Sequence, residues 1–355
     1  MCRINKMFNI NYMNMNRFWL FLLGFMTACG ESKLPQFPPE HFSKSREITS
    51  CFTLDLEKFD ILKPYTVFRY NNWYVFDDRD FDAHLKLLSI DQTKVLKGIP
   101  EGNGPFEVVG YFNIMNQDGS ILVDDVNHRR MIGVDIISDS LAFINIPYLD
   151  SSFAHHYPFG CGKFLELPSY GHTSFIRLRG NGKTVYSSLP MPPDGIISEM
   201  NAVNKYSIYL NTKVAVSPDK SKYAWGVNSF PYYGFGRIID DSLYADKYYF
   251  YSTLTIGKIW EDLVMPDNEQ RINVLAATSS DKYAIFLYSD NIYKDAGKFS
   301  GNTILLYSWD GEPILKLLVK ERLLFITYDI ERKRLIGLTE EPQGLLVEYD
   351  MSDIL

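Results

Sequence analysis

Short runs of alternating or continuous hydrophobic residues, separated by turn residues, fill most of the chain. After about residue 46, no apolar pattern of helical period lasts three turns, whereas β-branched and aromatic residues are common in the runs. Asn, Asp and Gly are frequent in the connections, and these residues tolerate the left-handed backbone of tight hairpin turns. The pattern therefore predicts an all-β fold with few helices.

The runs group into about six units of roughly 40–50 residues, which is the period of propeller blades with four strands each. The clearest unit has expected strands at residues 111–115, 120–123, 130–134 and 141–144. Five units are placed near residues 63–100, 106–147, 150–192, 205–256 and 270–320. The last unit ends after three strands, so we expect residues 47–54 to supply its fourth strand and close the ring. The prediction is a six-bladed β-propeller.

The first thirty residues carry the pattern of an export signal. Arg17 precedes an apolar run at residues 18–26, which fits a signal-peptide core but is shorter than the ~20 residues of a membrane-spanning helix. The following Met26-Thr27-Ala28-Cys29-Gly30 resembles the lipobox of bacterial lipoproteins, with Met26 where Leu is commonest. The resemblance implies cleavage before Cys29 and acylation of its thiol and amine, which would anchor the chain stably. A plain cleavable signal followed by an ordinary Cys is the alternative.

These assignments divide the chain into a signal peptide at residues 1–28, a lipidated tether at residues 29–45 and a propeller domain at residues 46–355. The tether is polar and proline-rich, so it would be semi-rigid and hold the domain off the membrane. The basic end of the signal is long, which makes Met13 and Met15 alternative translation starts to Met1. The expected location is the cell envelope, lipid-anchored and facing the periplasm or the cell surface.

The net charge of the chain argues against one class of partner. Three of the 36 basic residues lie before Cys29 and no acidic residue does, so the mature chain would carry 33 basic and 43 acidic residues, a formal charge of −10. An acidic surface repels phosphate backbones, and no Lys/Arg cluster interrupts it. We therefore expect no nucleic acid partner. Hydrophobic residues make up 46% of the chain and aromatic residues 15%, which favours packed sheet over disorder.

A glycine-rich segment between the first two units carries a family resemblance. It contains Gly102-Asn103-Gly104-Pro105-Phe106-Glu107, which is similar to the Gly-x-Gly-Pro-x-Glu signature of six-bladed, TolB-like propeller lipoproteins. Residues 214–219 likewise resemble the strand and Ser-Pro-Asp turn of TolB-type blades, although Lys220 stands where that turn usually has Gly. The resemblance implies a periplasmic or membrane-surface location, with Gly102, Gly104, Pro105 and Glu107 as structural motif residues. It implies no particular activity.

Candidate chemistry is sparse. Carboxylates cluster at residues 77–80, 124–125 and 240–241, and the first two clusters follow the second strand of a unit, so they would lie in loops at one end of the ring. Asp78, Asp125 and the nearby His128 are the candidates for the mouth of the central channel, as an acid/base or calcium site. Solvated loop charges are the simpler interpretation.

The sequence contains no recognisable metal, cofactor or nucleophile motif. His155 and His156 would point to opposite faces of a strand, and neither a Gly-x-Ser-x-Gly elbow nor a phosphate-binding loop occurs. Cys51 and Cys161 fall in different units, so both are expected to be free and buried. Aromatic runs at residues 230–235 and 244–251 could pack between blades or stack on sugars or peptides.

These features favour a non-enzymatic module. We expect a membrane-tethered lipoprotein whose propeller mouth engages an unidentified protein, peptide or glycan, without a cofactor. The alternative is a propeller hydrolase or lyase with carboxylates or His at the central channel; a glycosidase of this kind needs two carboxylates about 5–10 Å apart in a pocket. Convergence of Asp78 or Asp125 with His128 in a deep channel would favour the enzyme, and an aromatic mouth would favour binding.

Overall fold

Strands dominate the computed structural model, which describes residues 38–355 apart from residues 81, 111, 118, 148–152, 161–162, 169–175, 181–182, 188–199, 201–206, 210, 231, 251–255, 260–263, 296–298 and 341–343. The helical elements with described bounds are single 3-10 turns, η1 (Pro38–His41), η2 (Glu57–Phe59) and η3 (Tyr293–Asp295). The predicted all-β class is confirmed. Within the described ranges, no helix is long and apolar enough to cross a membrane.

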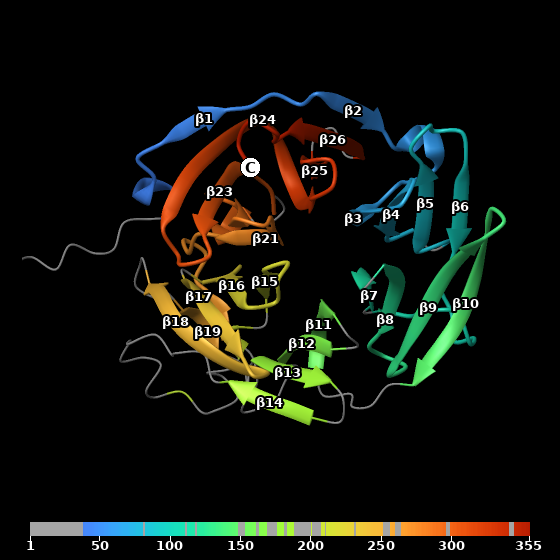
Figure 1. Ribbon diagram of the computed structural model, residues 1–355, viewed down its shortest axis with the longest axis horizontal. Coiled ribbons are helices and arrows are strands. Elements are labelled where there is room, and N and C mark those ends of the chain that lie inside the picture. Colours follow the sequence, from blue (N-terminus) through green and yellow to red (C-terminus); the bar gives the residue numbers. More distant parts are fainter. Residues whose placement is uncertain are drawn as a thin grey trace, which may run out of the picture.

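Four antiparallel sheets of four strands follow one another along the chain and stand around a common centre (Figure 1). The first contains β3 (Pro64–Tyr70), β4 (Trp73–Asp78), β5 (Leu85–Ser89) and β6 (Val95–Gly98), and the second contains β7 (Phe112–Gln117), β8 (Ser120–Asp125), β9 (Arg130–Ile137) and β10 (Ser140–Pro147). The third contains β11 (Phe153–Gly160), β12 (Lys163–Pro168), β13 (Ile176–Gly180) and β14 (Lys183–Ser187), and the fourth contains β15 (Thr212–Val216), β16 (Lys222–Val227), β17 (Tyr232–Ile239) and β18 (Ser242–Phe250). Each sheet lies within one predicted unit.

The last part of the chain forms one eight-stranded sheet instead of two separate units. Its strands are β21 (Val274–Ser279), β22 (Tyr283–Tyr288), β23 (Gly301–Ser308), β24 (Pro313–Asp329), β25 (Arg334–Thr339) and β26 (Leu345–Asp350), with β1 (Ser45–Glu47) and β2 (Phe52–Asp55) added from the start of the described chain. The long β24 pairs with β23 mainly over residues 313–318 and with β25 over residues 323–329. A two-stranded sheet of β19 (Ile256–Ile259) and β20 (Val264–Pro266) was not predicted. The arrangement is propeller-like, with four separate blades and this larger sheet.

The start of the described chain pairs with its end. β2 runs antiparallel to β26, with Phe52 opposite Glu348 and Asp55 opposite Leu345, and the side chain of Leu54 is buried there. The pairing covers backbone groups of β26 that an open edge would expose. The predicted closure by residues 47–54 is confirmed for β2. The parallel pairing of β1 with β24 is a second closing contact that the sequence pattern did not predict.

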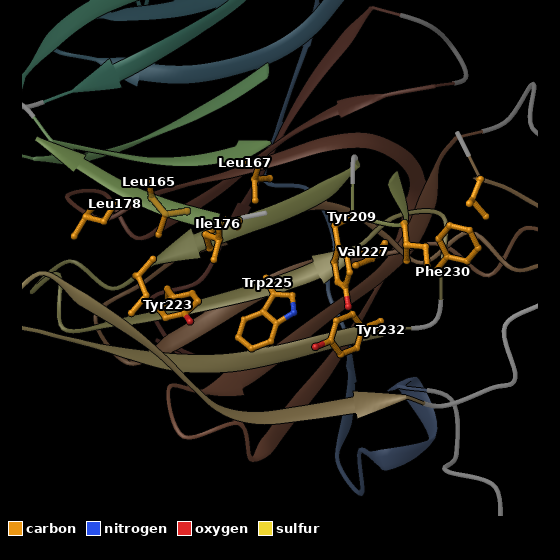
Figure 2. Close-up of a cluster of buried hydrophobic side chains, with 14 of the residues drawn as sticks. Leu165, Leu167, Ile176, Leu178, Tyr209, Tyr223, Trp225, Val227, Phe230 and Tyr232 are labelled. Atoms are coloured by element: carbon orange, nitrogen blue, oxygen red, sulfur yellow. The ribbon is translucent and has the colours of Figure 1, made fainter. Parts of the chain in front are cut away.

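Apolar side chains fill the spaces between neighbouring sheets. Between the third and fourth sheets, Leu165 and Ile176 lie in one buried cluster with Tyr223 and Trp225 (Figure 2). The run of buried residues in β16 reflects this position, because its side chains are covered on both faces. Gly234 faces the indole, and a Cβ there would lie 2.3 Å from a ring carbon of Trp225. The close approach of sheet and indole therefore requires glycine.

The first strand of each four-stranded sheet lies nearest the centre of the ring and the fourth lies at the rim (Figure 1). β3 contacts both β7 and β24, and β7 contacts β11. Because the strands alternate in direction, β4 and β8 end where β3 and β7 begin. We call this end of the first two sheets the loop face (residues 56–63, 79–80, 82–84, 99–110 and 126–129).

Candidate functional site

Two buried carboxylate pairs end the second strands of the first two sheets. Asp77 and Asp78 end β4, and Asp124 and Asp125 end β8, each at most 1% exposed. Successive strand residues point to opposite faces, so the two members of a pair meet different parts of the protein. The interpretation of these groups as solvated loop charges is wrong, because they are buried strand residues and each has an ion-pair partner. Asp240, in contrast, is exposed in a turn.

Asp78 anchors the connection that enters the first sheet. Its two carboxylate oxygens accept hydrogen bonds from the backbone N–H groups of Leu62 at 3.0 Å and Lys63 at 2.6 Å. The buried ammonium of Lys86 lies 2.9 Å from Asp78 and 3.1 Å from Asp80. Burial by itself would lower the pKa of Lys86, but these two carboxylates outweigh it and raise the pKa, so the side chain stays charged.

Asp125 and His128 are brought together, as the sequence suggested, but in a structural arrangement. His128 Nδ1 lies 2.7 Å from Asp125, and its Nε2 lies 3.0 Å from the side-chain oxygen of Asn103. Arg130 Nε donates to the same Asp125 oxygen at 2.9 Å. Both imidazole nitrogens are therefore engaged by the protein. Asp78, at the equivalent end of β4, shares none of these described partners.

The glycine-rich motif forms a loop that is closed on its own glutamate. Gly104 N–H donates to the Glu107 carboxylate at 2.7 Å, and Arg130 donates to the Gly104 carbonyl at 2.8 Å and also to the Glu107 carbonyl. Gly102 has φ of +156°, and a Cβ there would lie 2.1 Å from the carboxylate. One turn, in which both glycines lie close to the Glu107 carboxylate, thus explains the spacing of Gly102, Gly104 and Glu107. Pro105 is exposed in this turn.

A buried charge network joins the second and third sheets. His156 on β11 is hydrogen bonded to Asp124 on β8, and its other ring nitrogen lies 3.1 Å from Glu166 on β12. Arg177 and Arg179 on β13 also bind Glu166. Burial would lower the pKa of His156, but the hydrogen bonds to Asp124 and Glu166 outweigh it and raise the pKa to about 9. The imidazole is therefore a cation at neutral pH and links the sheets.

At the loop face, Arg79 links the first sheet to the second. Its Nη2 donates to Asp77 at 2.8 Å and to the backbone carbonyl of Phe112 at 3.0 Å. The guanidinium carbon lies 4.0 Å from the centre of the Phe112 ring and 4.8 Å from that of Tyr65. Burial raises the pKa of Asp77 to about 7, against the opposing effect of Arg79.

Tyr65 owes its position to an irregularity in β3. Pro64 lies opposite Asp78 and Thr66 opposite Asp77, so Tyr65 is an extra residue between two paired neighbours. Such bulges redirect side chains, and they are common next to functional sites. The side chain of Tyr65 is 53% exposed although β3 is the innermost strand of its sheet.

The sequence pattern predicts neither Tyr65 nor Arg79 as a site residue. Arg79 lies within the acidic run at residues 77–80, where the pattern indicates only a counter-ion for its neighbours. A bulge depends on how two strands pair, and Pro64 ahead of Tyr65 is the one local signal, because Pro is common at strand starts and bulges.

The remaining candidates have structural roles or lie outside the described residues. Phe230, Tyr232, Tyr233 and Phe235 are buried, so this aromatic run packs between sheets. The expectation that Cys51 is buried is wrong: it is exposed in the connection between β1 and β2, which runs along the outside of the ring (Figure 1). Cys29 and Cys161 lie outside the described residues, as does the side chain of His155. In the part of the chain that the structure describes, no group of three or more His, Cys, Asp or Glu side chains could hold a metal ion.

Comparison with known proteins identifies the fold and leaves the family open. No family model matches the chain, and no curated protein matches it. The crystal structure of a member of the DUF4221 family from Bacteroides vulgatus ATCC 8482 matches with a TM-score of 0.53 at 12% identity, covering 85% of this chain and 97% of that chain. At this identity the likeness shows a shared fold alone.

Two further solved structures show weaker likeness. A luciferin-regenerating enzyme has a TM-score of 0.48 at 10% identity, with 84% of this chain and 94% of that chain covered. The β-propeller domain of Cps50 (Swd1) from Myceliophteria thermophila has a TM-score of 0.46 at 9% identity, with 85% and 98% covered. The class of protein that the fold defines is an all-β, propeller-like protein.

Proposed function

We propose that this protein is a lipid-anchored lipoprotein of the cell envelope whose propeller is a binding or scaffold module for a protein, a peptide or a glycan. The observation that carries the proposal is the pairing of the buried charges at the loop face. Asp78 holds the connection into β3, and Asp125 holds His128 and Arg130, which in turn holds the glycine-rich loop. Loops that are already ordered lose less conformational entropy when a partner binds.

A hydrolase or lyase is less well supported by the same contacts. A general acid or base must be free to exchange a proton with a bound substrate. Asp78 and Asp125 are 0% exposed and bind protein groups, and both ring nitrogens of His128 have protein partners. The three residues on which the enzyme alternative depended are therefore already engaged by the protein.

We infer that the propeller has six blades and belongs with the TolB-like lipoproteins. In this division of the eight-stranded sheet, residues 313–318 of β24 are the outer strand of a fifth blade and residues 323–329 are the inner strand of a sixth. β2 is then the outer strand of the sixth blade, as its pairing with β26 allows. The family assignment depends on the motif from Gly102 to Glu107 and on this blade number.

The lipid anchor can be tested with the full chain in a bacterial host that is fed radiolabelled palmitate. Label should enter the wild-type protein and the Cys51→Ser control, which removes the exposed thiol of the described region, and it should not enter Cys29→Ser. Equal labelling of Cys29→Ser would contradict the anchor.

The binding role can be tested by affinity capture of the full chain from detergent-solubilised membranes, followed by identification of co-purifying proteins and glycans. We expect one component to be enriched over an unrelated lipoprotein, and to be reduced by Arg130→Ala, because that change releases the Gly104 and Glu107 carbonyls. Absence of any enriched component, or capture that Arg130→Ala does not change, would contradict binding through the loop face.

A further inference from the structure

We propose that Tyr65 and Arg79 form a carbohydrate-binding subsite at the mouth of the ring, with the tyrosine ring stacking on a neutral sugar and the guanidinium donating to its oxygens. The inference rests on the proposed binding function and names its ligand class. It starts from the exposure of Tyr65, since an aromatic ring left in water gives up the free energy of burial.

The position of Tyr65 separates it from the other exposed aromatic residues. Among the described residues, Tyr244 and Tyr248 lie on the outer strand β18, and Phe299 lies in the connection before β23. Tyr65 instead lies on β3, which contacts the inner strands β7 and β24. It is therefore the exposed aromatic side chain of the described inner strands.

Bulges near the start of inner strands recur in this fold. Register shifts occur between Pro64 and Thr66 in β3, between Phe153 and His155 in β11, and between Val274 and Ala276 in β21. Leu275, the bulged residue of β21, is 8% exposed, in contrast to the 53% exposure of Tyr65. A bulge at this position therefore does not by itself force a side chain into water. The bulge of β21 buries its leucine, whereas the bulge of β3 exposes its tyrosine.

Arg79 is a fixed donor that lies over one face of this ring, with its guanidinium carbon 4.8 Å from the ring centre, so the opposite face is the one left for a sugar. Asp77, the Phe112 carbonyl and the Phe112 ring hold the guanidinium, and both described hydrogen bonds use Nη2. The N–H groups on Nε and Nη1 have no described hydrogen-bond partner, and the side chain is 28% exposed. A rigid guanidinium with spare donors next to an aromatic face can bind a ring that has hydroxyl acceptors on its edge.

Charge favours a neutral sugar over an anion. Above pH 7 Asp77 is mostly ionised and its carboxylate, 2.8 Å from Arg79, balances the guanidinium, so the pair then has little net attraction for a second negative charge. The chain after Cys29 carries 33 basic and 43 acidic residues, so its overall field also repels anions. A neutral pyranoside needs only donors, acceptors and an apolar face, and these are what the two side chains offer.

The test uses the full chain in micelles of a zwitterionic detergent, since glycosidic detergents would compete. The probes are four neutral oligosaccharides, namely maltohexaose, cellohexaose, xylohexaose and mannohexaose, together with the acidic hexagalacturonic acid. Binding is measured by calorimetry and by saturation-transfer NMR. The variants are Tyr65→Ala, Tyr65→Phe, Arg79→Met and the matched control Tyr244→Ala, whose ring is similarly exposed at 48% on the outer strand β18.

We expect at least one neutral oligosaccharide to bind, and Tyr65→Ala and Arg79→Met each to weaken it about tenfold or more. Tyr65→Phe keeps the ring and should bind within about twofold of the wild type, as should Tyr244→Ala. Circular dichroism of each variant checks that it is folded. The inference is overturned if no neutral probe binds, if hexagalacturonic acid alone binds, or if Tyr65→Ala and Tyr244→Ala behave alike.

The failure of this inference can be told apart from failure of the binding function. A protein partner that the wild type and Tyr65→Ala capture equally would leave the binding module intact and overturn the sugar subsite. Loss of a captured glycan in Tyr65→Ala, with Tyr244→Ala unchanged, would support both.

Discussion

The imidazole of His156 in the third sheet is hydrogen bonded to Asp124 in the second sheet, which ties two neighbouring sheets together through buried charges. Because the pKa of His156 is raised to about 9 from an unfolded value of 6.5, folding favours its protonated form. The stabilisation is fully present below pH 6.5 and is lost as pH rises through 9. We expect a loss of about 3 kcal/mol in unfolding free energy between these limits.

Urea unfolding at pH 6.5, 8 and 10 measures this loss. His156→Gln removes the titrating group, so its unfolding free energy should be lower than that of the wild type at pH 6.5 and should fall less between pH 6.5 and 10. Parallel pH curves for the two proteins would show that His156 is not the group responsible.

Asp77 also makes the unfolding free energy fall as pH rises, but over a lower pH range than His156. Its pKa is raised to about 7, chiefly by burial, so ionisation destabilises the fold as pH rises from 3.8 towards 7. Asp77→Asn keeps an acceptor for Arg79 without a buried charge. We expect it to be more stable than the wild type at pH 8, by up to about 4 kcal/mol, and to show no such advantage at pH 4. A difference from the wild type that is the same at both pH values would refute the pKa shift as its cause.

Closure of the ring by β2 predicts unequal effects for two neighbouring residues. Leu54 is buried against the last strands, whereas Thr53 on the other face of β2 is exposed. Leu54→Ala should lower the unfolding free energy by about 3 kcal/mol, and Thr53→Ala should change it by less than about 0.5 kcal/mol. Chemical denaturation of both variants is the measurement. Similar small losses would mean that this strand contributes little to the closed ring.

The strands were predictable from the sequence because their signal is local. Hydrophobic alternation and turn residues placed the four separate sheets within predicted units, and the missing fourth strand of the last unit pointed to residues 47–54. The continuity of β24 was not predictable, since residues 319–322 continue an extended chain between two pairing regions. The short β19 and β20 gave too few alternating positions to stand out.

The site was less predictable because its contacts join residues that are distant in the sequence. Spacing alone brought Asp125 and His128 together, three residues apart, and placed Gly102, Gly104 and Glu107 in one loop. Nothing local indicates that Asp124 meets His156, 32 residues later, or that Arg79 reaches Phe112. Without those partners, buried strand-end carboxylates look the same as solvated loop charges.

The glycine-rich loop predicts coupling between Gly104 and Glu107. The Glu107 carboxylate accepts a hydrogen bond from the Gly104 N–H. A Cβ on residue 104 would lie 2.8 Å from the carboxyl carbon of Glu107. Gly104→Ala should therefore destabilise the wild type more than it destabilises Glu107→Ala, with an interaction energy of about 1 kcal/mol. A double-mutant cycle by urea unfolding gives this value, and Glu101→Ala in place of Glu107→Ala is the control for loss of a nearby acid. Additive effects would mean that the loop has no such contact.

Lys220 predicts a stabilising substitution in the Ser-Pro-Asp turn. It has φ of +62°, a left-handed conformation that costs a residue with a Cβ roughly 1 kcal/mol and costs glycine nothing in strain. The turn is held by Asp219, which accepts from the Ser217 hydroxyl at 2.5 Å and the Ser221 N–H at 3.1 Å, so Lys220→Gly keeps every described contact of the turn. Glycine also loses about 0.4–1 kcal/mol more conformational entropy on folding, which leaves an expected net gain of up to about 0.6 kcal/mol. Lys282→Gly is the matched control, because Lys282 is exposed in the turn between β21 and β22 and does not have a positive φ. It should lower the unfolding midpoint in urea while Lys220→Gly raises it; a fall in both would show that the strain at Lys220 is smaller than the entropy of glycine.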